Sequence, residues 1–93
     1  MGTYRVVTVT TTPTRLLDMH PCREEYVIQN QDTLIDLYIA PSKDVATSGT
    51  RKGRILAPLG MESANKKEDS KIIVEEQYGI VASGSITVWV WEA

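Results

Sequence analysis

The chain has 93 residues and a formal net charge of −2, with 42% hydrophobic and 24% charged residues. This length suits one compact domain with a modest core, and the near-neutral charge gives no overall positive field that would draw the chain to nucleic acid. No apolar stretch approaches the roughly 20 residues that a membrane-spanning helix needs.

The composition is rich in β-branched residues. Nine Val, eight Ile and ten Thr make up 27 of the 93 residues, against six Leu, six Ala and no Phe. Side chains of this kind are restricted at χ1 and suit a pleated sheet better than a helix. We therefore expect an all-β protein.

Turn residues divide the chain into about seven short strands. Pro13 ends the first strand, because proline cannot donate a hydrogen bond to a sheet ladder. Alternation in the third strand places Ile35, Leu37 and Ile39 on the face toward the core. The expected strands, in chain order, are residues 5–12, 24–29, 34–40, 54–56, 71–75, 78–82 and 85–91.

The connections between these strands carry signals of their own. Residues 14–19 have room for one helical turn, which is too short to be a stable helix. Residues 41–53 and 61–70 are polar, and we expect both to be exposed loops. Ser83–Gly84, between the last two strands, is a two-residue hairpin signal because glycine readily takes a positive φ.

Short strands with turns at roughly ten-residue spacing predict a single small antiparallel β-sandwich or jelly roll. We assign the sandwich to residues 23–93, and an N-terminal strand or arm followed by a loop to residues 1–22. The proline at position 13 would free the first strand to lie away from the sandwich.

The amino terminus lacks the basic and then apolar segments of a signal peptide. Cys22 is the only cysteine, so no disulfide can form within the chain. Both features lead us to expect synthesis in a reducing cytoplasm.

The sequence offers little for catalysis. A nucleophilic cysteine needs an imidazole beside it and a third group that orients the imidazole. Cys22, His20 and Asp18 are close enough in sequence for these roles, but a surface histidine and an idle cysteine explain the same residues. Two good ligands also fall short of the four that a structural zinc takes. We therefore predict no enzyme, no metal and no cofactor, and rank an enzyme that uses Cys22 and His20 last among the alternatives.

Arg51, Lys52 and Arg54 form a basic cluster after the turn at residues 47–50. Backbone amides of such a turn can hold an anion, but the glycine spacing is one residue too short for a Walker loop. A solvated, charged loop is the simpler interpretation, and docking onto an acidic protein surface is the alternative.

The last strand is apolar on both faces, although a strand that covers a single core needs only one apolar face. Alternation separates Ile86, Val88 and Val90 from Thr87, Trp89 and Trp91. The two tryptophans therefore lie under the N-terminal arm, face a protein neighbour, or form a platform for sugar rings. Tryptophan is enriched at protein interfaces, whereas a sugar platform usually has several polar neighbours and the sequence supplies only Glu92. We rank the protein interface above the sugar site.

Five segments follow one another in an order that resembles a known family: Tyr26–Asn30, Ile35–Ala40, Leu56–Gly60, Gln77–Gly84 and Ile86–Glu92. Together they resemble the small β-sandwich virion proteins of tailed bacteriophages, which include head decoration (cement) proteins. The resemblance covers about two thirds of the chain. The chain departs from the family pattern at the expected Pro-Gly turn, where a leucine separates the two residues.

The resemblance implies a virion structural protein, made in the host cytoplasm, that binds and stabilises the head lattice. Its partners would be the major capsid protein or other virion subunits and further copies of itself, with a trimer favoured, and it would contact neither nucleic acid nor membrane directly. A head, neck or tail component of another kind and a small carbohydrate-binding module using Trp89 and Trp91 are the alternatives. The expected interface residues are Tyr4, Val6, Val9, Arg51, Lys52, Arg54, Trp89 and Trp91.

Overall fold

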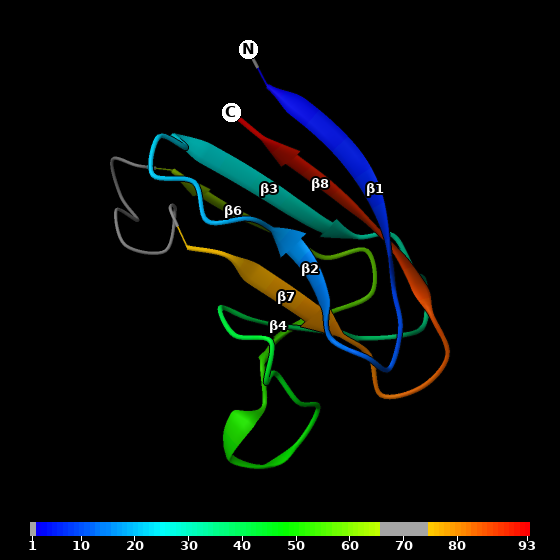
Figure 1. The fold of residues 1–93 in the computed structure, drawn as a ribbon. Coiled ribbons are helices and arrows are strands. Elements are labelled where there is room, and N and C mark those ends of the chain that lie inside the picture. The colour runs from blue at the N-terminus through cyan, green and yellow to red at the C-terminus, as the bar shows by residue number, and fades with distance from the viewer. Residues whose placement is uncertain (1, 66–74) are drawn as a thin grey trace.

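The computed structural model describes residues 2–65 and 75–93, which form two antiparallel four-stranded sheets packed together (Figure 1). The strands are β1 (Thr3–Val9), β2 (Thr14–Leu17), β3 (Glu25–Asn30), β4 (Leu37–Ala40), β5 (Arg54–Leu56), β6 (Met61–Asn65), β7 (Gln77–Ile80) and β8 (Ile86–Glu92). Sheet A has the order β1-β8-β3-β6, and sheet B has the order β2-β7-β4-β5. The predicted all-β sandwich is confirmed. The described part of the chain contains no helix that could cross a membrane.

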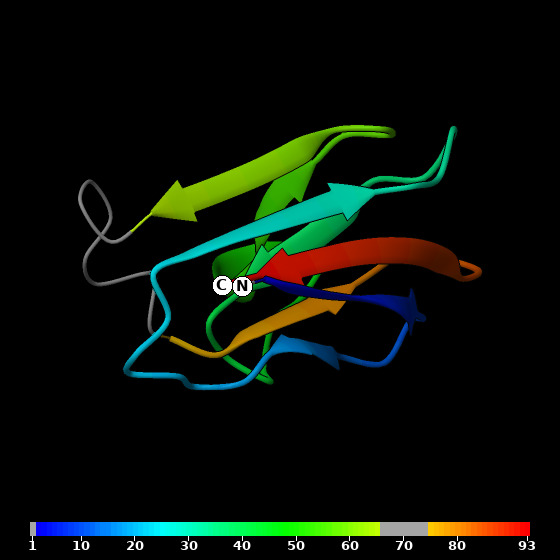
Figure 2. The same cartoon turned by 90° about the horizontal axis from the view of Figure 1, so that it is seen from above.

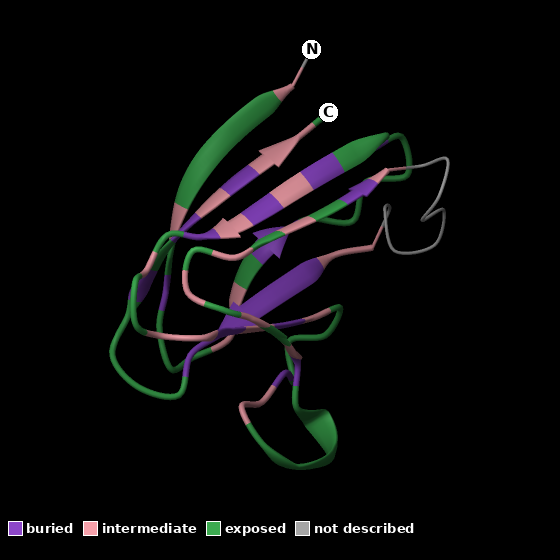
Figure 3. Ribbon diagram, turned by 180° about the vertical axis from the view of Figure 1, so that it is seen from behind, coloured by how far each residue is buried: buried purple, intermediate pink, exposed green. Residues whose placement is uncertain are grey.

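The core lies between the two sheets. Burial alternates along β3 and β8 with a period of two, so one face of each strand points inward (Figure 3). Leu37 and Ile39 of β4 are buried as predicted, and Ile35 packs against the same core from the segment before the strand. The local patterns in these strands therefore report their orientation correctly.

Two segments differ from the prediction. Residues 14–17 form β2 and not a helical turn, because they pair with the edge of β7. Residues 61–65 form β6 and not a loop, because they pair with β3 over their whole length. Ala64 is the one buried residue of this strand, so the sequence shows no apolar alternation there. The strand expected at residues 71–75 lies outside the described residues, apart from Glu75.

The hairpin predicted at Ser83–Gly84 is wrong. β7 belongs to sheet B and β8 to sheet A, so this segment carries the chain from one sheet to the other. Gly84 does have a positive φ of 68°. The signal therefore identifies the local backbone turn, while packing between sheets decides which sheet the next strand joins.

Residues 3–17 contribute a strand to each sheet. β1 pairs with β8 from Thr3 opposite Glu92 to Val9 opposite Ile86, and both views of the fold show the two strands side by side (Figures 1 and 2). The expected N-terminal arm is thus an integral edge strand and does not lie away from the sandwich. Its pairing with the long last strand outweighs the break that a proline causes after it.

Candidate interaction surface

The outer face of sheet A carries two rows of side chains that cross all four strands. Strand register places Tyr4, Trp91, Val27 and Ser63 in one row, and Val6, Trp89, Gln29 and Met61 in the next. We call these eight residues the outer-face cluster. The predicted two-faced character of β8 is confirmed, because Val88 and Val90 are fully buried while the two tryptophans are half-buried on the opposite face.

Exposure within the outer-face cluster is greatest at the two edges of the sheet. Tyr4 is 69% exposed and Val6 62% exposed on β1, and Met61 is 58% exposed on β6. Between them Trp89 and Trp91 are half-buried by their neighbours. The rings of Tyr4 and Trp89 are tilted by 38° with centroids 6.1 Å apart, an arrangement that aromatic pairs favour. The cluster is thus a packed aromatic and aliphatic surface that remains open to solvent.

β1 lies beside the tryptophans and not over them. Gly2, just before β1, approaches Trp91 closely, since a Cβ added there would lie 2.3 Å from Nε1 of Trp91. The N-terminal strand takes a place in the sheet as the partner of β8, so it cannot also cover the outer face. The N-terminal segment therefore touches the tryptophans from the side, through Gly2 at Trp91 and Tyr4 at Trp89, and leaves both half-buried.

Polar residues border the outer-face cluster at both ends of the sheet. Glu25 pairs with Asn65 at one end, and Thr8 pairs with Thr87 at the other. Within the cluster, Oε1 of Gln29 accepts a hydrogen bond of 2.6 Å from a neighbouring glutamine side chain. An apolar centre with a polar rim is the usual anatomy of a protein interface.

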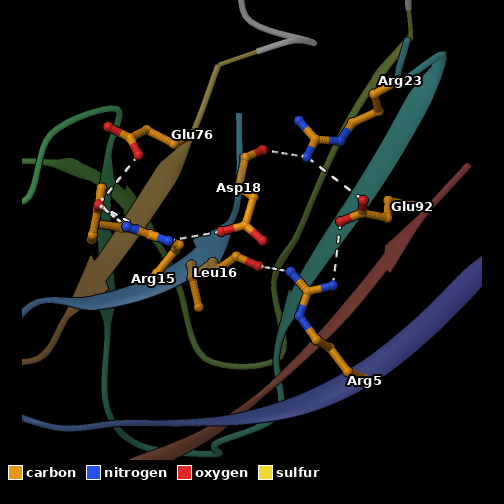
Figure 4. Close-up of polar contacts among 8 residues, drawn as sticks. Arg5, Arg15, Leu16, Asp18, Arg23, Glu76 and Glu92 are labelled. Atoms are coloured by element: carbon orange, nitrogen blue, oxygen red, sulfur yellow. Dashed lines mark hydrogen bonds and ion pairs between the residues drawn. The ribbon is translucent and has the colours of Figure 1, made fainter. Parts of the chain in front are cut away.

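An arginine–glutamate network holds β1 and β8 together next to this surface (Figure 4). Oε2 of Glu92 accepts a hydrogen bond of 3.2 Å from Nη1 of Arg5. Oε1 of Glu92 lies 3.6 Å from Nη2 of Arg23. Arg5 also donates to the carbonyl of Leu16, which connects β1 to β2 of the other sheet. Arg23 is buried, and it donates to the carbonyl of Asp18 at 2.6 Å. These contacts stabilise the register that places the outer-face cluster in rows.

Two of the eight expected interface residues are engaged within the fold, one buried in the core and the other half-buried in an ion pair. Val9 is fully buried, because odd-numbered residues of this part of β1 face the core. Arg54 is half-buried and forms a two-pronged ion pair with Glu62, with Nε to Oε1 at 2.5 Å and Nη2 to Oε2 at 2.8 Å. Their geometry gives Val9 a packing role and Arg54 a role in connecting the sheets.

The Arg54 ion pair belongs to a cluster that joins β5 of sheet B to β3 and β6 of sheet A. Nη2 of Arg54 also donates to Oε1 of the buried Gln77 at 2.9 Å, and the Tyr26 hydroxyl donates to Glu62 at 3.1 Å. Burial raises the pKa of Tyr26, and the charge of Glu62 raises it further. The hydrogen bond to Glu62 raises the pKa of Arg54. We call these four residues the clasp.

Arg51 and Lys52 lie away from the outer-face cluster, on the loop that follows β4. Both are exposed and line a shallow pocket of about 330 Å³ that also includes Asp44 and Thr50. Nζ of Lys52 lies 6.0 Å from the centre of the Tyr38 ring. The acidic residue offsets part of the positive charge, so the pocket shows no concentrated anion site.

The segment proposed as a remote catalytic alternative is open to solvent. Cys22 is exposed, and the carboxylate of Asp18 accepts a hydrogen bond of 3.0 Å from Arg15 instead of orienting His20. Within residues 2–65 and 75–93, no group of three or more His, Cys, Asp or Glu side chains is arranged to hold a metal ion. The described geometry therefore adds no support to a catalytic role for this segment.

The chain matches no protein-family model, no curated protein and no solved structure. The resemblance to bacteriophage virion proteins stays a prediction. The function is therefore inferred from the residues themselves and from the surface that they form.

Proposed function

We propose that the protein is a structural component of a bacteriophage virion, and specifically a decoration protein that stabilises the head by binding the major capsid protein. The observation that carries this proposal is the outer-face cluster on β8 and its neighbours. A core of this size requires one apolar face from each sheet, yet sheet A has two. A partner that covers the second face accounts for it.

The chemistry of the outer-face cluster favours a protein partner. Trp89 and Trp91 present large rings whose position is already restricted by packing, so little side-chain entropy is lost when a neighbour covers them. The surface carries no charged side chain in either row. Binding through it would therefore depend on apolar contact and show little sensitivity to salt.

The direct test is binding of the purified chain to expanded empty heads of a phage that encodes it, measured by co-sedimentation. Trp89→Ser removes a central member of the outer-face cluster, and we expect a loss of affinity of about 30-fold, typical of an interface anchor. Ile55→Ser is the matched control, because Ile55 is an apolar residue 50% exposed on β5 of the other sheet. Absence of binding to heads, or an equal loss with Ile55→Ser, contradicts the proposal.

A carbohydrate-binding module is the second candidate, and one observation favours it. Strand pairing brings Gln29 beside Trp89, and Glu25 and Asn65 lie beyond Val27 on the same face, so the tryptophans have polar neighbours that are distant in sequence. Tryptophan fluorescence titrated with a panel of glycans distinguishes the two candidates. Saturable quenching by a glycan, together with no binding to heads, would favour the module.

A further inference from the structure

β1 is the longest edge strand in the described part of the sandwich. It has seven residues, compared with five in β6, four in β2 and three in β5. β2 is also interrupted by a register shift between Arg15 and Leu17. A long and regular edge presents a row of backbone N–H and C=O groups that another strand can pair with. β1 is exposed along most of its length (Figure 3).

β1 lacks the features that usually protect an edge strand. Residues 3–9 contain no proline and no lysine. Arg5 is the only charged residue among them, and both Nη atoms of its guanidinium are engaged, one with Glu92 and one with the carbonyl of Leu16. Residues 3–9 therefore have no unpaired charged side chain that would oppose pairing of a second strand at the open edge.

The two rows of the outer-face cluster end abruptly at β1. Tyr4 and Val6 are more exposed than the tryptophans beside them, because no strand lies on their other side. A strand added at this edge would extend both rows and cover these side chains. The sequence of β1 itself, with β-branched residues at most positions, is suited to be that strand.

We propose that β1 pairs in an antiparallel manner with β1 of a second copy of this chain, about a twofold axis at Val6. The two four-stranded A sheets would then form one continuous sheet. Val6 lies opposite its symmetry mate, Tyr4 lies opposite Thr8, and Arg5 lies opposite Val7. No like charges face each other in this register, which makes the edge self-complementary. The symmetry is twofold and differs from the trimer expected from the sequence.

The inference rests on the proposed function in one respect, that the chain acts as a subunit of an assembly. A single pair of seven-residue strands buries less area than a standard interface. The free dimer is therefore weak, with a dissociation constant on the order of 100 µM. Binding to a lattice would raise the local concentration and favour the pairing.

A symmetric disulfide tests the register. Opposed residues of antiparallel strands have Cα atoms about 4.5–5.5 Å apart, within reach of a disulfide. Val6→Cys, made together with Cys22→Ser, should give a disulfide-linked dimer on a non-reducing gel after mild oxidation. Met61→Cys in the same background is the matched control, because Met61 is 58% exposed on the opposite edge of sheet A, and it should stay monomeric. No linked dimer with Val6→Cys, or equal linkage with Met61→Cys, overturns the inference.

Sedimentation equilibrium provides a second measurement that does not depend on oxidation. The apparent mass of the wild type should rise from 10.4 kDa toward twice that value as the concentration approaches 1 mM. Val6→Lys alone should remain a monomer, and an equimolar mixture with Val6→Glu should recover the dimer. A monomeric wild type at all concentrations, or a Val6→Lys variant that dimerises as the wild type does, contradicts the inference. If the chain binds heads but does not dimerise, the inferred dimer is wrong and the proposed function stands. If the chain dimerises but does not bind heads, the proposed function is wrong and the dimer stands.

Discussion

Replacing Arg54 with methionine removes the centre of the clasp. Its Nε and Nη2 atoms donate to Glu62 at 2.5 and 2.8 Å, and Nη2 donates to Gln77 at 2.9 Å. Methionine preserves part of the apolar stem but has no donor. The substitution therefore leaves a largely buried carboxylate without its cation, and a fully buried amide oxygen without its donor.

The expected loss in the free energy of unfolding is about 3 kcal/mol. Hydrogen bonds to charged groups contribute roughly 1.5–3 kcal/mol each. The side chains of Arg54 and Glu62 are 35% and 21% exposed, so solvent screening reduces each contribution, and bonds within one cluster do not add fully. In a domain of this size each kcal/mol corresponds to about 4–8 °C. We therefore expect the thermal midpoint to fall by about 12–24 °C.

Thermal unfolding followed by far-UV circular dichroism measures this change. Arg51→Met is the matched control, because Arg51 lies exposed on the loop after β4, and its midpoint should stay close to that of the wild type. Combining Arg54→Met with Glu62→Leu should restore much of the lost stability, since an apolar pair can replace a buried ion pair. A midpoint of Arg54→Met within a few degrees of the wild type would refute the role of the clasp.

Three further substitutions address other parts of the fold. The raised pKa of Tyr26 means that its neutral phenol stabilises the fold below pH 10 and that this contribution is lost as the pH rises further. Urea unfolding should therefore show Tyr26→Phe gaining on the wild type by about 1.4 kcal/mol per pH unit above pH 10, and parallel curves would contradict this. Gly53→Ala should lower the thermal midpoint more than Gly49→Ala. A Cβ at position 53 would lie 2.8 Å from the backbone of β4, whereas a Cβ at position 49 would meet no atom within 4 Å and would be opposed only by the positive φ of 80°. Val88→Ala, at a fully buried site, should cost about 2 kcal/mol in urea unfolding, and a loss under 0.5 kcal/mol would exclude tight packing there.

Strand alternation was sufficient to predict the fold class and the inward face of β4, and it separated the two faces of β8. In β4 large aliphatic side chains recur at every second position, so a period of two records which face is covered. The boundaries of β5 also agree with the prediction. β6 was missed because its single buried residue, Ala64, is too small to give a pattern.

The outer-face cluster could be predicted only in part. Tyr4, Val6, Trp89 and Trp91 were expected at an interface, since two of them make β8 apolar on both faces. Val27, Gln29 and Met61 join them only through the pairing of β3 with β8 and with β6. That register depends on packing between segments far apart in the chain, which a local pattern does not contain. The one sign of the outer-face cluster in this part of the sequence was Val27, an apolar residue between the core residues Tyr26 and Ile28.

The pairing of β1 with β8 also determines the order in which the molecule can assemble during synthesis. Residues 3–9 leave the ribosome well before residues 86–92, the strand with which they pair in the described part of the chain. At a synthesis rate of about 5–20 residues per second, β1 remains without its hydrogen-bonding partner strand for several seconds. During that interval its apolar, β-branched sequence is accessible to chaperones or to another nascent chain. Completion of sheet A is therefore a late event in folding, limited by the arrival of the last strand.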